Sequence, residues 1–136
     1  MEARAQKNLV LILARDLASK LATPMFIADA EGNLVFYNEP AEVILGRKYS
    51  ERYEVSPEDW TKLLQPTDME GAALGLDEVP PGIALMHRRP AHAQVRITGL
   101  DRIARTVSVT AFPLFARAEE FVGLLAIFWE DGQPGS

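Results

Sequence analysis

The sequence lacks cysteine altogether. This absence excludes disulfides, thiolate nucleophiles, thiolate metal sites and any photochemistry that joins a flavin to a cysteine. It also fits a reducing compartment, and we predict a cytoplasmic location. Histidine is scarce as well, because the chain has only His87 and His92. They lie five positions apart across Pro90, a spacing that suits a shared metal site poorly, so we predict no metal site.

Long apolar runs are missing too. The N-terminal run covers only residues 9–14 before Arg15 and Asp16 interrupt it. Such a run is too short for the core of a signal peptide or for a membrane-spanning helix. A second run, residues 121–129, predicts a strand that is buried on both faces. We therefore expect neither a targeting segment nor a membrane partner.

The composition that remains is that of one globular domain. The 136 residues are 48% hydrophobic and 24% charged, which is average for such a domain. Fourteen basic and 19 acidic side chains give a net charge of −5, so we expect no nucleic-acid partner. Residues 86–105 carry five arginines against one aspartate. Either a solvated surface or a face for an acidic partner or a nucleotide would explain them.

The apolar pattern predicts an α+β domain. A helix is predicted over residues 5–21, with an apolar stripe that includes Leu9, Leu13 and Leu17. Pro24 ends it, and a hairpin with Gly32 in its turn follows over residues 25–38. Three short helices are then predicted, over residues 40–45, 57–64 and 81–88. Alternating strands are predicted over residues 93–98, 105–114 and 121–130.

Several stretches carry a resemblance to a known family. Asp29, Gly32, Asn38, Ala41 and Gly46 have the spacing of a first hairpin and first helix. The matching stretches are residues 24–33, 38–42, 44–46, 109–114 and 123–130. In this order and at these separations, the sequence resembles the PAS domain family over about residues 17–131.

The resemblance implies a five-stranded antiparallel sheet in the order 2-1-5-4-3, with short helices on one face and an N-terminal flanking helix. We predict a flanking helix over residues 1–22, a PAS-like domain over residues 23–131 and a flexible tail over residues 132–136. Members of the family sense and dimerise, and they are rarely catalytic. The partner that receives the signal would act in trans or belong to a domain outside this sequence.

The resemblance also predicts which side chains point into the cup between sheet and helices. They fill a small core in one interpretation and bind a small apolar ligand in the other. The fourteen candidates are Phe26, Ala28, Ile44, Leu45, Trp60, Leu64, Ile83, Met86, Val95, Ile97, Val107, Val109, Leu124 and Phe128.

No cofactor is predicted for this cup, but two alternatives remain open. The light-oxygen-voltage branch of the family needs the cysteine that this chain lacks. The ring of a non-covalent flavin would need hydrogen bonds from amide side chains in the last strands. At those positions this sequence has Ile97, Val107 and Phe128. A haem ligand would correspond to His87, although Arg88 follows it at once and indicates a solvated helix end.

The other face of the predicted sheet is apolar as well. Exposed apolar faces of this size are rare in monomers, so something is expected to cover it. The N-terminal helix could do so within one chain or within a homodimer, and we predict a homodimer. The predicted interface residues are Leu9, Leu13, Leu17, Met25, Ile27, Leu125, Ile127 and Trp129.

A catalytic function is the alternative to a sensory one. Small cone-shaped α+β folds host isomerases and dehydratases, which need a buried Asp, Glu or His as a base. Here Asp29 and Glu130 fall at strand ends, and His87 and His92 fall at helix and loop ends. We therefore predict a non-catalytic sensory and interaction domain.

Overall fold

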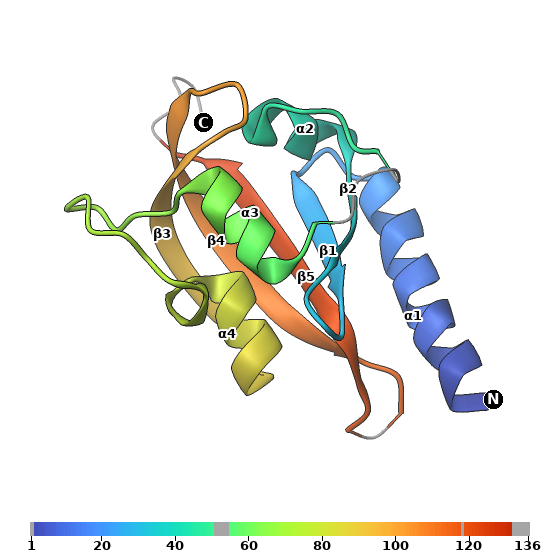
Figure 1. Cartoon of the computed structure of the whole chain (residues 1–136). Helices are drawn as coiled ribbons and strands as arrows, with labels where there is room; N and C mark the ends of the chain where they lie inside the picture. The colour runs from blue at the N-terminus through green and yellow to red at the C-terminus, as the bar shows by residue number, and fades with distance from the viewer. Residues whose placement is uncertain (1, 51–54, 118, 132–136) are drawn as a thin grey trace.

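A five-stranded antiparallel sheet forms the centre of the molecule (Figure 1). The computed structural model describes residues 2–50, 55–117 and 119–131. The strands are β1 (Met25–Asp29), β2 (Leu34–Tyr37), β3 (Ala91–Thr98), β4 (Ala104–Phe115) and β5 (Phe121–Glu130). Their spatial order is β2-β1-β5-β4-β3, which confirms the predicted order.

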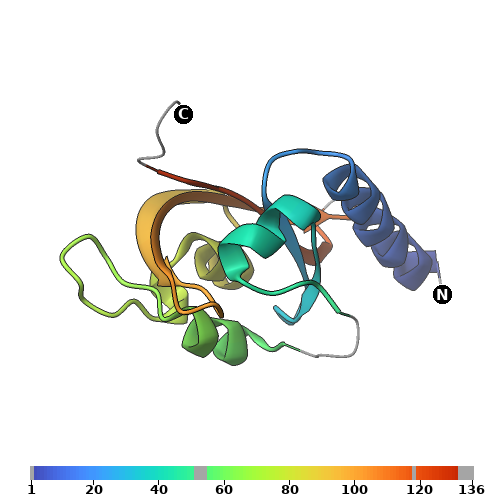
Figure 2. The same ribbon diagram turned by 90° about the horizontal axis from the view of Figure 1, so that it is seen from above.

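Helices lie on both faces of this sheet. The helical elements are α1 (Glu2–Ser19), α2 (Glu39–Leu45), α3 (Pro57–Leu64), the 3₁₀ helix η1 (Leu76–Glu78) and α4 (Pro80–His87). Seen from above, α1 stands apart from the three later α-helices (Figure 2). The later helices cover what we call the inner face, and α1 packs on the outer face.

Polar capping residues stabilise the first turns of α2 and α3. Asn38 caps α2, and its side chain accepts a hydrogen bond from the backbone of Ala41. Ser56 and Asp59 form a reciprocal capping box at the start of α3, as the sequence predicts. Gly46 ends α2 with a φ of 79°, a conformation that glycine adopts at little cost.

Alternation along the strands separates two apolar clusters. Ala28, Val107 and Leu124 are buried in the inner cluster, which the later helices cover. Ile27 and Leu125 are buried in the outer cluster, together with Ala18 from α1. Because successive strand residues point to opposite faces, one apolar strand such as β5 serves both clusters.

The element boundaries differ slightly from the predicted ones. The first helix begins at Glu2 and ends at Ser19, two residues before the predicted end. The third strand begins at Ala91, two residues earlier than predicted. The sequence did not predict η1. The predicted flexible tail, residues 132–136, lies outside the described residues.

Candidate functional site: an apolar cup and the helix behind the sheet

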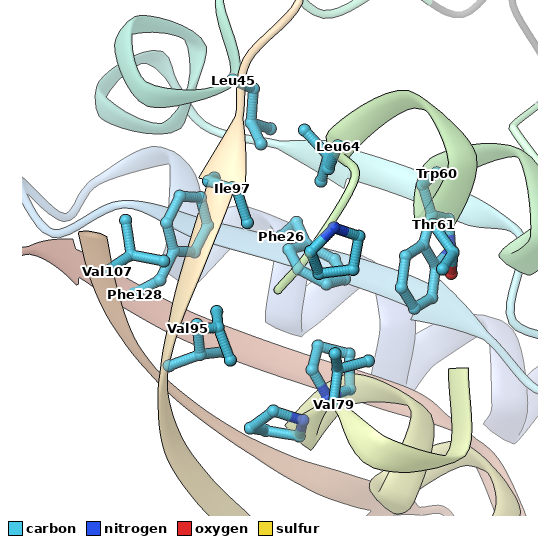
Figure 3. A pocket seen from close by; sticks show the side chains of 14 residues that line it. Phe26, Leu45, Trp60, Thr61, Leu64, Val79, Val95, Ile97, Val107 and Phe128 are labelled. Atoms are coloured by element: carbon cyan, nitrogen blue, oxygen red, sulfur yellow. The ribbon is translucent and has the colours of Figure 1, made fainter. Parts of the chain in front are cut away.

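A small cavity lies between the inner face of the sheet and the later helices (Figure 3). Its volume is about 60 Å³. We call it the cup. Its lining residues are Phe26, Leu45, Trp60, Thr61, Leu64, Pro66, Val79, Pro80, Pro81, Val95, Ile97, Val107, Val109 and Phe128. None of these fourteen side chains is charged, so the cup offers an apolar environment.

Nine of the fourteen predicted cup residues line this cavity. They are Phe26, Leu45, Trp60, Leu64, Val95, Ile97, Val107, Val109 and Phe128. The strand positions among them are those that the resemblance to the PAS family implied.

The other five predicted residues lie elsewhere. Ala28, Ile44 and Leu124 are buried in the inner cluster but do not line the cavity. Ile83 is half-buried, and Met86 is 53% exposed instead of pointing into the cup. The reason is the rotation of α4, which turns Ala84 and Leu85 toward the inner cluster.

Sequence reasoning missed five lining residues, namely Thr61, Pro66, Val79, Pro80 and Pro81. The three prolines lie at or beside the ends of predicted helices, a position that does not indicate their part in the wall. Thr61 lies beside Trp60 and three positions before Leu64, a helical spacing that could have indicated it.

The polar groups near the cup already have partners. The Thr61 hydroxyl donates to the Pro57 carbonyl over 2.8 Å, and the Trp60 indole N–H donates to the Gly32 carbonyl over 3.1 Å. Buried polar groups without partners are costly, so a ligand of this cup would have to be apolar where it is enclosed.

Three aromatic rings form one side of the cup. The Phe26 ring lies between those of Trp60 and Phe128, at centroid distances of 6.1 Å to each. The two pairs are tilted by 54° and 56°, within the range of favourable aromatic contacts. Phe26 therefore links the helical wall of the cup to its strand wall.

The residues present do not fit a flavin or a haem. Pockets for ligands of drug size measure about 300–1,000 Å³, far more than this cup. Ile97, Val107 and Phe128 line the cup where a flavin would need amides. His87 is exposed at the end of α4 and is not a lining residue. Among the described residues, no group of three or more His, Asp or Glu side chains could hold a metal ion.

The candidate catalytic groups also lie outside the cup. The Asp29 carboxylate accepts hydrogen bonds from the backbones of Glu31 and Asn33 in the first hairpin. Glu130 lies 3.6 Å from the Arg105 Nε. Arg105 also donates to both oxygens of Asp101, and these bonds hold the pKa of that carboxyl below its usual value. These carboxylates therefore have structural partners.

The outer face of the sheet is covered by α1 of the same chain. Leu11, Ala14 and Ala18 make this contact, against Ile27 and Leu125. The predicted interface residues Met25, Ile27 and Leu125 are thus buried within one chain, at 5% exposure or less. The predicted stripe does not make the contact, because Leu9, Leu13 and Leu17 are exposed and are not part of the outer cluster.

A second apolar face of α1 remains exposed. Leu9 is 53%, Ile12 62%, Leu13 58% and Leu17 54% exposed. We call these four residues the exposed α1 face. They recur at intervals of one to four residues, the spacing of one side of a helix. The helix therefore has two apolar sides, and only one of them is covered by the described residues.

The remaining predicted interface residues lie on the outer side of β5. Ile127 is half-buried, whereas Trp129 is 42% exposed and stacks on His92 at a centroid distance of 6.0 Å. Nearby, Ser108 and Gln94 donate to the Asp131 carboxylate, and these bonds lower its pKa. This surface is polar around a single indole ring.

Comparisons with known proteins bear on the fold. The sequence matches no protein-family model and shows no significant match to a curated protein. The structure resembles the PAS domain of a Colwellia psychrerythraea protein, with a TM-score of 0.60 and 15% identity over 89% of this chain and 96% of that chain. Thus the likeness is one of structure, at low sequence identity.

Two further structures are similar. The PAS domain of BvgS from Bordetella pertussis has a TM-score of 0.59 and 16% identity, over 91% of this chain and 87% of that one. The LOV protein of Rhodobacter sphaeroides has a TM-score of 0.69 and 14% identity, over 100% of this chain and 71% of that one. The chain thus has the PAS fold. No helix among the described residues is long and apolar enough to cross a membrane.

Proposed function

We propose that this chain, which has the PAS fold, is a non-catalytic sensory and interaction module that works as a homodimer. The observation that carries the proposal is the exposed α1 face, with its four large apolar side chains. Contiguous exposed apolar patches commonly mark interaction sites. The opposite side of α1 already packs on its own sheet. A contact at the exposed α1 face would therefore place two α1 helices between the sheets of the two subunits.

A second copy of the chain is the partner that fits this face best. It presents the same apolar residues, and two-fold dimers bring identical patches together. Asp16 of α1 and Lys20, which follows the helix, form an exposed ion pair at 2.9 Å. Asp16 lies three positions after Leu13 and four after Ile12, so this pair is the polar part of the same side of the helix. The dimer proposed here uses the helix alone, since most of the sheet residues first predicted for the interface are buried.

Leu13→Glu is expected to weaken dimerisation at least tenfold, because it would bury a charge in an apolar contact. Light scattering at several protein concentrations measures the change. Leu63→Glu is the matched control, since Leu63 is an exposed leucine on a different helix. Trp129→Glu tests the sheet surface separately and should leave association unchanged. A wild-type protein that remains monomeric at micromolar concentration would contradict the proposal.

The cup supports a small, uncharged and apolar ligand rather than haem or flavin. Its lining is apolar, its volume is about 60 Å³ and its polar neighbours are already hydrogen-bonded. We expect the purified protein to show neither a Soret band nor a flavin band in its UV-visible spectrum. Native mass spectrometry would then detect a colourless ligand. A Soret band that disappears in His87→Ala would instead favour the haem alternative.

The signalling role has two further parts that stay predictions. The module would pass its signal to a partner in trans or to a domain outside this sequence, and it would act in the cytoplasm. A non-catalytic role is supported by the cup itself, because no carboxylate or imidazole lines it.

A further inference from the structure

An aromatic residue after α2, Tyr49, lies at the edge of the sheet that β2 forms. The Tyr49 ring contacts Phe36 at a centroid distance of 5.2 Å and Tyr37 at 5.4 Å, both nearly edge-to-face. Phe36 and Tyr37 are neighbours on β2 and therefore point to opposite faces. Tyr37 packs in the inner cluster and Phe36 in the outer one. Tyr49 thus touches both sides of the sheet.

On the outer side, these rings hold a cation of α1. The Arg15 guanidinium lies 4.7 Å from the centroid of the Phe36 ring and 5.6 Å from that of Tyr49. Phe36 packs in the outer cluster with Ala14 and Ala18, so this contact of Arg15 lies where α1 meets the sheet. A guanidinium held over aromatic faces contributes about 0.5–2 kcal/mol. The contact therefore helps to set how α1 lies on the sheet.

On the inner side, the same rings reach the cup. Tyr37 is paired across the strands with Phe26, which lines the cup. Its phenol is nearly buried and donates to the Arg47 carbonyl over 2.9 Å, and burial raises its pKa. Phe26, Tyr37, Tyr49 and Phe36 thus follow one another from the cup to α1, and we call this series the aromatic row. Phe26 and Tyr37 are linked as cross-strand neighbours in the inner cluster, and the other members are linked by ring contacts.

We infer that the aromatic row couples the cup to the position of α1, and that Arg15 is the positioning residue at its end. The inference rests on the proposed sensory function. A ligand that displaces the Phe26 ring displaces its neighbour Tyr37. Tyr37 in turn moves Tyr49, whose ring contacts Arg15. Because α1 also carries the exposed apolar face, a change at the cup reaches the proposed dimer contact.

A double-mutant cycle tests this coupling without any ligand. Phe26→Leu alters the cup end of the row, and Arg15→Gln removes the cation at the other end. Hydrogen exchange measures the protection of α1 amides relative to β5 amides in the full chain. We expect Phe26→Leu to speed α1 exchange about fivefold in the wild-type background, a typical coupling magnitude. In the Arg15→Gln background the effect should nearly vanish.

Two controls separate coupling from ordinary destabilisation. Val109→Ala removes side-chain volume from the wall of the cup on β4, outside the row, and should leave the relative protection of α1 unchanged. Lys20→Gln removes an exposed positive charge just beyond α1 and should leave the Phe26→Leu effect intact. Equal Phe26→Leu effects with and without Arg15 would overturn the inference, since independent sites are additive.

Xenon provides a second measurement, because dry apolar cavities bind it. In Trp129→Phe, the fluorescence of Trp60 reports xenon at the cup, since Trp60 is then the only tryptophan. We expect bound xenon to change α1 exchange in this background and not after Arg15→Gln is added. Binding that leaves α1 exchange unchanged overturns the coupling. Absence of binding contradicts the proposed ligand site, while the mutant cycle still decides the coupling.

Discussion

Asn38→Ala is expected to lower the free energy of unfolding by about 3–4 kcal/mol, which is large for one substitution. The side chain is 1% exposed and makes four hydrogen bonds. Its Nδ2 donates to the carbonyls of Ala18 and Thr23, each over 2.9 Å. Its Oδ1 accepts from the backbones of Met25 and Ala41, over 3.0 and 3.2 Å.

The expected cost is high because alanine leaves the partners without their bonds. A buried backbone group that loses its hydrogen bond costs about 1–3 kcal/mol, and loss of a helix cap costs about 1 kcal/mol. The four partners belong to the end of α1, the linker after it, the start of β1 and the first turn of α2. Asn38 therefore fixes α1 to the rest of the domain at one point.

Chemical denaturation measures the loss of unfolding free energy. Asn38→Ser separates the contribution of the helix cap from that of the other hydrogen bonds. Serine still caps α2 but does not reach the carbonyls of Ala18 and Thr23, so it should recover about 1 kcal/mol. Asn33→Ala is the matched control, since Asn33 makes its hairpin hydrogen bonds through its backbone. We expect it to change stability by less than about 1 kcal/mol. Equal stability of wild type and Asn38→Ala would show that the four bonds contribute nothing net.

The role of Asn38 illustrates what a sequence can and cannot predict. Its capping of α2 was predictable, because the following proline and apolar residues mark a helix start. Its bonds to Ala18 and Thr23 were not, since they join residues 15 to 20 positions apart in the chain. The alternation of apolar residues predicted the strands themselves, whereas their spatial order and the phase of each strand were implied by the resemblance to the PAS family.

The sequence did not predict correctly which side of α1 and α4 faces the sheet. In α1, the large residues Leu9, Leu13 and Leu17 formed the more obvious stripe, yet the sheet packs against Leu11, Ala14 and Ala18. Small residues let a helix lie close to a sheet, and a hydrophobicity pattern does not weigh that advantage. The rotation of α4 was missed for a similar reason, because it depends on the close approach of Gly82 to η1.

Gly82→Ala is expected to destabilise the protein by about 3 kcal/mol, in the range of severe overpacking. Helix propensity alone predicts the opposite sign, since alanine is up to about 1 kcal/mol better than glycine inside a helix. However, a Cβ at position 82 would lie 1.5 Å from the carbonyl oxygen of Leu76. That atom belongs to the backbone of η1, so the clash cannot be relieved by a side-chain rotation.

To relieve this clash, α4 must move away from η1. This movement would change the wall of the cup. Pro80 and Pro81, directly before Gly82, line the cavity beside Trp60. We therefore expect Gly82→Ala both to lower the denaturation midpoint and to change Trp60 fluorescence in the Trp129→Phe background. Gly71→Ala is the control, because its φ is +89° but nothing lies within 4 Å of the added Cβ. Gly71→Ala introduces backbone strain alone, which costs about 1 kcal/mol, and it should leave the fluorescence of Trp60 unchanged. If Gly82→Ala behaved like Gly71→Ala, the packing of α4 against η1 would not control the wall of the cup.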